Sequence, residues 1–187
     1  MPPSHRPSLG EMLFFLSSGI IVSIPMALFF EPSADFLRNF FPEMQAEILG
    51  VAVLAPIIEE FAKAYPLFYR HGESQKSLFM MGFLVGIGFG ITEFFGYVLL
   101  LGISPLVRLP GIFFHVALTS IIAYGIATRQ SMLFYLISVF LHFSINLLAI
   151  FDITGLPIAL VLVTAFLFSF FLYNKASEQT STTNNPV

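Results

Sequence analysis

Residues 131–151 read SMLFYLISVFLHFSINLLAIF, a run that contains no Asp, Glu, Lys or Arg. A helix that crosses a bilayer needs about 20 consecutive, mostly apolar residues, and this run meets that requirement. The strands of a membrane β-barrel would be only about 10 residues long and would alternate apolar with polar side chains, which this run does not do. The run therefore predicts a transmembrane helix.

Five more stretches of the chain share this length and apolar character, at roughly 12–30, 47–69, 78–101, 109–127 and 154–173. Short polar segments predict loops at 31–35, 70–76, 102–105, 128–130 and near Asp152. We therefore expect an all-α integral membrane protein, a bundle of about six transmembrane helices that forms one domain over residues 1–173. Residues 174–187 are polar and are predicted to form a disordered tail.

The overall composition excludes several classes of protein. Hydrophobic residues make up 57% of the chain, charged residues only 10%, and the mean hydropathy is +0.88. A soluble domain of 187 residues could not bury so much apolar surface. The 8 Lys and Arg residues form no cluster and the net charge is -3, which excludes nucleic acid as the main partner. The absence of cysteine excludes disulfides and thiolate metal sites.

The cations near the span ends favour one orientation in the cell membrane. With six spans, both termini share a side, and that side carries Arg6, Arg70, Lys76, Arg129 and Lys175. The opposite side carries only Arg38 and Arg108. Because cytoplasmic loops are enriched in Lys and Arg, both termini are predicted to be cytoplasmic.

Several polar residues lie inside the predicted spans, where a charged side chain costs roughly 2.5–3.5 kcal/mol at the bilayer centre. Counted at 1.5 Å per residue from the cytoplasmic ends, Glu60, His115 and His142 lie roughly 15, 18 and 16 Å deep. Glu93 lies roughly 22 Å deep, and Asn146 reaches a similar depth. We therefore expect a polar layer in the middle of the membrane, with a second layer slightly farther outward.

The spacing of these residues places them on shared helix faces. Residues four apart lie on one face, so Glu59 is aligned with Lys63, and His142 with Asn146. Lys63 is expected to neutralise Glu59 or Glu60, which is a structural role.

Glycine and proline mark how the neighbouring backbone should pack. Gly82, Gly86 and Gly90 form a stripe of small residues that lets another helix approach the third span closely. Glu93 follows that stripe and should project near the packed face rather than into lipid. Pro56 lies just before the glutamate pair, where it breaks the hydrogen-bond ladder and is expected to kink the helix toward the site.

This set of residues suits hydrolysis by an activated water molecule. A glutamate would act as the base, a histidine would assist at the water or the leaving amine, and an amide would stabilise the carbonyl oxyanion. No serine or cysteine nucleophile stands beside an evident base. The same side chains, His115, His142 and a glutamate, offer a zinc site with water as fourth ligand, although the chain has no HExxH motif.

Four short motifs in this set resemble those of the PrsW family of intramembrane proteases. Residues 59–63 resemble its EExxK motif, residues 89–93 its FxxxE motif, His115 its single histidine of the next helix, and residues 142–146 its HxxxN motif. The resemblance covers about residues 47–150, in the same order and on the expected helices. The family is related to the CAAX prenyl endopeptidases, but Lys63 and Glu93 depart from the EExxxR and FxxxH motifs of that branch.

The resemblance implies a glutamate-based protease that cleaves membrane-anchored proteins within the lipid bilayer, with anti-sigma factors as one substrate class. The implied catalytic residues are Glu59, Glu60, Glu93, His115, His142 and Asn146. By the same resemblance Glu59 is the base, because the first glutamate of the pair has that role in the CAAX branch, while His142 and Asn146 would form the oxyanion site. We expect no cofactor; if zinc is present, His115, His142 and Glu59 would bind it.

Two other functions remain open at this point. Aph-1, a distant relative within γ-secretase, indicates that such a fold can serve as a non-catalytic membrane scaffold or immunity protein. An ion-coupled transporter would use the same buried acids, but it would more often show inverted repeats and broken helices in matching halves, which the sequence lacks. The full set of glutamates with both histidines favours the protease.

Overall fold

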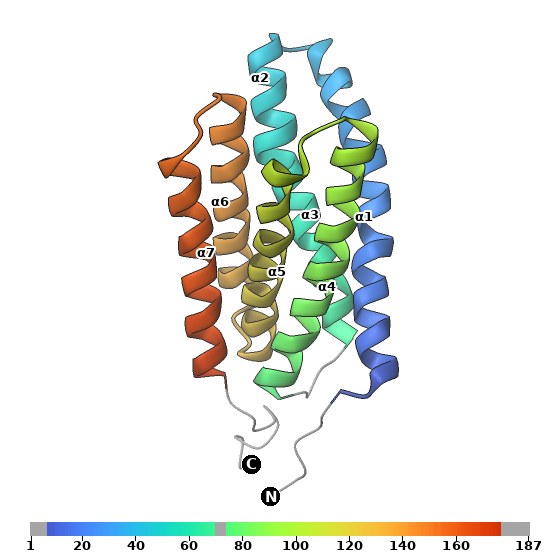
Figure 1. The fold of residues 1–187 in the computed structure, drawn as a ribbon, viewed down its shortest axis with the longest axis vertical. Coiled ribbons are helices and arrows are strands. Elements are labelled where there is room, and N and C mark those ends of the chain that lie inside the picture. The colour runs from blue at the N-terminus through green and yellow to red at the C-terminus, as the bar shows by residue number, and fades with distance from the viewer. Residues whose placement is uncertain (1–6, 70–73, 177–187) are drawn as a thin grey trace, which may run out of the picture.

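The computed structural model describes residues 7–69 and 74–176, and nearly all of this part is helical (Figure 1). In chain order its helices are α1 (Leu9–Arg38), α2 (Glu43–Glu47), the π-helix η1 (Ile48–Leu54), α3 (Ala55–Ala64), the 3₁₀-helix η2 (Tyr65–Tyr69), α4 (Gln75–Phe95), the π-helix η3 (Gly96–Leu100), α5 (Pro105–Ala127), α6 (Ser131–Ile150) and α7 (Leu156–Lys175). The prediction of an all-α membrane bundle is confirmed.

Within the described residues, four helical segments are long and apolar enough to cross a membrane: Gln75–Leu100, Pro105–Ala127, Ser131–Ile150 and Leu156–Lys175. They coincide with the last four predicted spans. The apolar part described for α1, Leu9–Ile24, is shorter. The stretch 47–69 carries two glutamates and a lysine. It is helical throughout, but its hydrogen-bond register changes from the end of α2 to η1, α3 and η2.

Two predicted boundaries are wrong. Residues 31–35 do not form a loop, because α1 continues to Arg38; one proline removes a single hydrogen bond, and the rest of the ladder continues the helix. The tail does not begin at residue 174, because Asn174 still belongs to α7 and its Nδ2 donates to the Phe170 carbonyl at 3.0 Å. The remainder of the predicted tail, 177–187, lies outside the described residues, as do Arg6 and Arg70.

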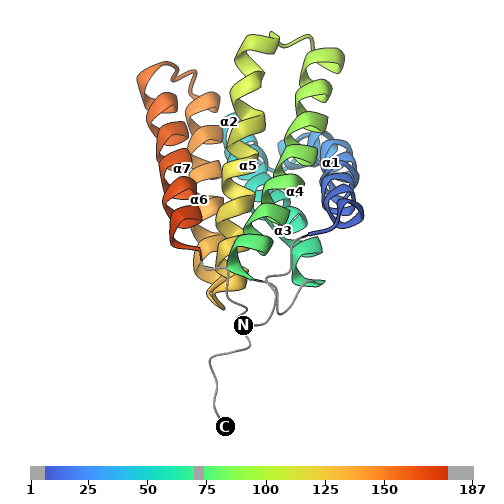
Figure 2. The same ribbon diagram turned by 60° about the horizontal axis from the view of Figure 1, so that its bottom comes forward.

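The order of the helices across the bundle is the same in two views. Figures 1 and 2 place α7 and α6 on one side and α1 on the other, with α5 and α4 between them. The first turn of α1 and the last turn of α7 lie at the same end in Figure 1, as expected for an even number of passes.

Glycines set the spacing around α4, which packs against both α1 and α5. A methyl group added to Gly88 would lie 3.2 Å from the Cα of Gly19 in α1. It would lie closer still to the carbonyl oxygen of Leu16, one turn earlier in α1. On the opposite face, a methyl group on Gly86 would lie 2.6 Å from the Cα of Val116 in α5. The predicted glycine stripe therefore does bring two helix backbones together, as small residues do in membranes.

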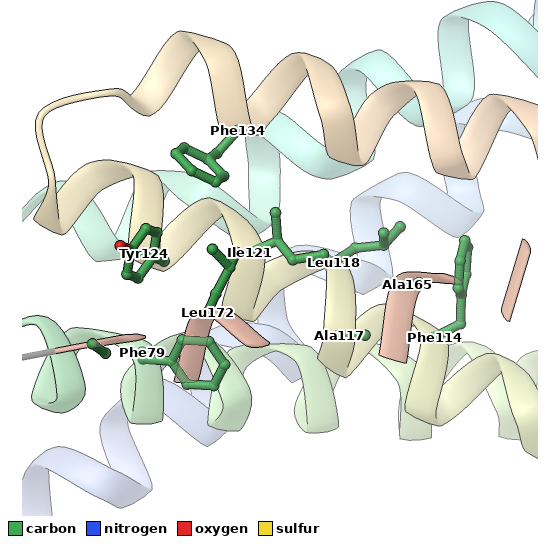
Figure 3. Packing of buried hydrophobic residues seen from close by; sticks show 10 residues of the cluster. Phe79, Phe114, Ala117, Leu118, Ile121, Tyr124, Phe134, Ala165 and Leu172 are labelled. Atoms are coloured by element: carbon green, nitrogen blue, oxygen red, sulfur yellow. The ribbon is translucent and has the colours of Figure 1, made fainter. Parts of the chain in front are cut away.

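The largest hydrophobic cluster surrounds α5. Figure 3 shows its residues, which come from four helices: Phe79, Phe114, Ala117, Leu118, Ile121, Tyr124, Phe134, Ala165, Leu172 and Ala176. Half of the cluster lies on α5, between α4, α6 and α7. Helix α5 thereby carries His115, which directly follows Phe114, into the interior of the bundle.

Candidate active site

Helix α3 carries two glutamates and a lysine into the bundle. Both Glu60 and Lys63 are fully buried, and the Lys63 ammonium donates to Glu60 Oε1 at 2.6 Å. The two residues are three apart on one helix, so the pair forms within α3 itself. Lys63 therefore neutralises Glu60, the second of the two partners considered from the sequence. Glu59 retains 12% of its side-chain exposure.

His142 of α6 lies against both glutamates. Its Nδ1 is 2.7 Å from Glu60 Oε1, and its Nε2 is 3.8 Å from Glu59 Oε2. An ionised carboxylate only accepts hydrogen bonds, so Nδ1 carries the proton and donates to Glu60. In the neutral imidazole this leaves the Nε2 lone pair directed toward Glu59.

His115 of α5 is held in the same manner by a different carboxylate. Its Nε2 is 2.5 Å from Glu93 Oε2, and its Nδ1 is 3.0 Å from Lys63 Nζ. Because an ammonium only donates, Nδ1 accepts and the proton of the ring lies on Nε2, which donates to Glu93. Each histidine thus has one nitrogen fixed by a carboxylate and the other directed toward the residues of α3.

Arg108 extends this network toward the start of α5. Its Nη2 lies 3.0 Å from Glu93 Oε1, and its guanidinium group lies 3.5 Å from the ring centroid of Tyr97. From the sequence Arg108 was counted only as a loop cation. Its position in the sequence could have predicted the pairing. Arg108 lies at the beginning of an apolar helix, at the outward level estimated for Glu93, and a charged side chain in a membrane usually pairs with an opposite charge.

Aromatic rings cover the network on its apolar side. The Phe89 ring lies 4.9 Å from the His115 ring and 4.8 Å from Lys63 Nζ, measured from the ring centroid. The Phe114 and His142 rings are perpendicular, with their centroids 5.9 Å apart. The two imidazoles themselves are 5.3 Å apart. Rings at these distances keep lipid away from the charged groups and restrict how the imidazoles can rotate.

Asn146 occupies a different place from the other predicted site residues. It follows His142 by one turn of α6, and its Nδ2 donates to the Val51 carbonyl of η1 at 2.9 Å. The sequence placed it in an outer layer with Glu93. In the described structure Glu93 is instead engaged by His115 and Arg108.

Three of the predicted residues could hold a metal ion together. One ligand atom each from Glu59, His115 and His142 lie within 4.8 Å of one another. Within the described residues, Glu59 Oε2 is buried and has no hydrogen-bond partner, so it is an acceptor that the protein itself leaves unsatisfied. The other nitrogen of each histidine is bound to a carboxylate, which is the usual arrangement around a metal-bound histidine. The donor set therefore fits a divalent cation such as zinc.

Comparison with known families identifies the chain. The family model described as PrsW family intramembrane metalloprotease matches residues 7–173. Comparisons with curated proteins and with solved structures give no match. The matched range includes every helix that contributes to the network of carboxylates and histidines. The chain belongs to the PrsW family, and it is an intramembrane protease.

Proposed function

We propose that the protein hydrolyses a peptide bond of a membrane-anchored protein at Glu59, His115 and His142, with a zinc ion held by these three side chains. The observation that supports the proposal is the approach of one carboxylate and two imidazoles from three helices to within 4.8 Å. Catalytic zinc sites commonly use three protein ligands of this kind and leave a fourth position for water. The family description, which includes the word metalloprotease, agrees with this assignment.

The side chains around the three ligands would have distinct roles. Glu60 and Glu93 fix the tautomers of His142 and His115, so that the lone pairs lie on His142 Nε2 and His115 Nδ1. His115 Nδ1 accepts from the Lys63 ammonium at 3.0 Å, so Lys63 would have to release it when a cation binds. Lys63 balances the charge of Glu60, and Arg108 that of Glu93. A bound zinc ion would polarise the scissile carbonyl and favour deprotonation of water.

Glu59 is the group that would meet the reacting water. Its side chain is partly accessible, whereas that of Glu60 is fully buried and already accepts from Lys63 and His142. A carboxylate has two oxygens, so one oxygen of Glu59 can bind the cation while the other accepts a proton from water. This assigns to Glu59 both a ligand role and the role of base that we expected from the sequence.

Removal of metal is the experiment that tests this function. We expect the purified full chain, in vesicles with a single-span substrate protein, to lose at least about 10²-fold in cleavage rate with a chelator and to recover with Zn²⁺. The same chelator presaturated with zinc is the control for nonspecific inhibition.

The other outcomes point to the alternatives. Cleavage that is unchanged by the chelator would leave hydrolysis to the glutamates without metal, which is the mechanism expected from the sequence. A chain that binds membrane proteins but cleaves none of them under any condition would instead be a scaffold.

We also propose that both chain termini face the cytoplasm, which follows from the distribution of Lys and Arg. The chain has no cysteine, so single introduced cysteines make clean probes. Gln130→Cys and Ser104→Cys are suitable because both positions are exposed and lie in loops at opposite ends of the helices. An impermeant thiol reagent added to intact cells should label the Ser104 variant and not the Gln130 variant; the reverse pattern would invert the orientation.

A further inference from the structure

The helix that leads to the glutamate pair has a defect in its hydrogen-bond ladder. In the π-helix η1 each N–H reaches back five residues, and the Ala55 N–H accordingly donates to the Gly50 carbonyl. The next N–H in this register would belong to residue 56 and would donate to Val51, but residue 56 is proline and has no N–H. In α-helical register the donor to Val51 would be Ala55, which is already committed to Gly50. The Val51 carbonyl is therefore left without its backbone donor.

A side chain from another helix supplies the missing donor. Asn146 Nδ2 of α6 donates to the Val51 carbonyl at 2.9 Å. Within a membrane an unsatisfied backbone carbonyl is costly, because no water is present to replace the lost hydrogen bond. Asn146 therefore compensates for the proline.

The same helix also holds the two glutamates that follow. His142, four residues before Asn146 and on the same face of α6, contacts Glu60 and faces Glu59. Tyr135, farther toward the start of α6, donates its hydroxyl to the Ile57 carbonyl of α3 at 2.7 Å. Contacts from α6 thus lie on both sides of the break at Pro56.

We infer that Asn146 is a positioning residue: by binding the carbonyl that Pro56 leaves free, it fixes the start of α3 and holds Glu59 opposite His142. This inference rests on the proposed function, in which Glu59 and His142 act together. It differs from the oxyanion role that the family resemblance implies for Asn146, in which the amide would contact the substrate.

A double-mutant cycle with Pro56 separates the two roles. Alanine at position 56 restores an N–H, and the Val51 carbonyl then has a backbone donor in either register: residue 56 in the π-helix or residue 55 in the α-helix. We expect Asn146→Ala to reduce cleavage about 10–100-fold in the natural background, the usual cost of losing a residue that supports a ligand. In the Pro56→Ala background the same change should cost less than about threefold.

Matched controls are available in the chain. Asn174 also donates Nδ2 to a backbone carbonyl, at 3.0 Å, so Asn174→Ala removes the same type of bond at the exposed end of α7 and should leave cleavage unchanged. Pro110 lies inside α5, and Pro110→Ala should not rescue Asn146→Ala. Asn146→Leu replaces the alanine variant if that variant yields too little folded protein, because leucine has nearly the same volume and no donor.

A second readout does not depend on proteolysis. Amide hydrogen exchange over residues 55–60, followed by mass spectrometry on the purified full chain, should be faster in Asn146→Ala and return to the natural rate when Pro56→Ala is added. If the proposed function is wrong, the unmodified chain cleaves nothing or cleaves without metal, and in either case this exchange pattern should still be observed. The inference is overturned if Asn146→Ala reduces cleavage equally in both backgrounds, as an oxyanion donor would, or if it changes neither cleavage nor exchange.

Discussion

Replacing Glu59 with glutamine is expected to abolish proteolysis while the bundle remains folded. Glutamine has nearly the same size as glutamate and can still accept a hydrogen bond, but it has no negative charge to hold a cation and no basicity toward water. The loss of one transition-state contact in a hydrolase costs about 10²–10³ in rate, and loss of this carboxylate should cost at least as much. The rate of cleavage of a single-span substrate in vesicles measures the effect.

The matched control is Glu43→Gln. Glu43 lies exposed in α2, so the same chemical change there should leave the cleavage rate within error. Glu60→Gln should have a smaller effect than Glu59→Gln, because it keeps an acceptor for His142 and Lys63. Full activity in both the Glu59 and the Glu60 variants would exclude the site proposed above.

Replacing Lys63 with methionine is expected to lower the stability of the bundle by about 3–5 kcal/mol, the usual cost of breaking a buried ion pair. Methionine fills a similar volume, but it leaves Glu60 charged and without its cation in a fully buried position. The midpoint of thermal or denaturant unfolding in detergent micelles measures the change. The fraction of folded chain should fall before the activity of each folded molecule does.

Two further variants test the reason for that loss. Lys175→Met removes an exposed lysine at the end of α7 and should leave stability unchanged. Adding Glu60→Gln to Lys63→Met removes the unpaired charge and should recover part of the stability, since removal of both partners is far less costly than removal of one. A double variant less stable than Lys63→Met would show that packing, not charge, determines the effect.

The spans from residue 75 onward could be predicted from the sequence because length and apolar character alone determine them. The prediction 154–173 for the last helix differs from Leu156–Lys175 by two residues at each end. The stretch 47–69 was predicted as one helix and is helical throughout, but Pro56 does not indicate the hydrogen-bond register on either side of it. The carbonyl that this register leaves without a backbone donor is bound by Asn146 of α6, and such a contact between helices cannot be read from one segment.

The candidate site could be predicted in part, for a similar reason. Depth along a helix follows from counting residues, so the common level of Glu60, His115 and His142 could be estimated. The rotation of each helix about its axis determines which side chains meet, and counting does not supply it. Two contacts were not expected for this reason. Lys63 contacts His115 in addition to Glu60, and Arg108 pairs with Glu93.

The pairing of Glu60 with Lys63 inside a single helix bears on how the protein enters the membrane. Three separate charges in one segment would cost roughly 7.5–10.5 kcal/mol to place in the bilayer, at 2.5–3.5 kcal/mol each. Glu60 and Lys63 neutralise each other without help from any other helix. The newly synthesised segment can therefore enter the bilayer with only the charge of Glu59 uncompensated. The partner that faces Glu59 is on α6, which is synthesised later. The segment with the glutamate pair is therefore expected to reach its final depth only after α6 has been inserted, so that the site is assembled when α7 alone of the described helices is still to be added.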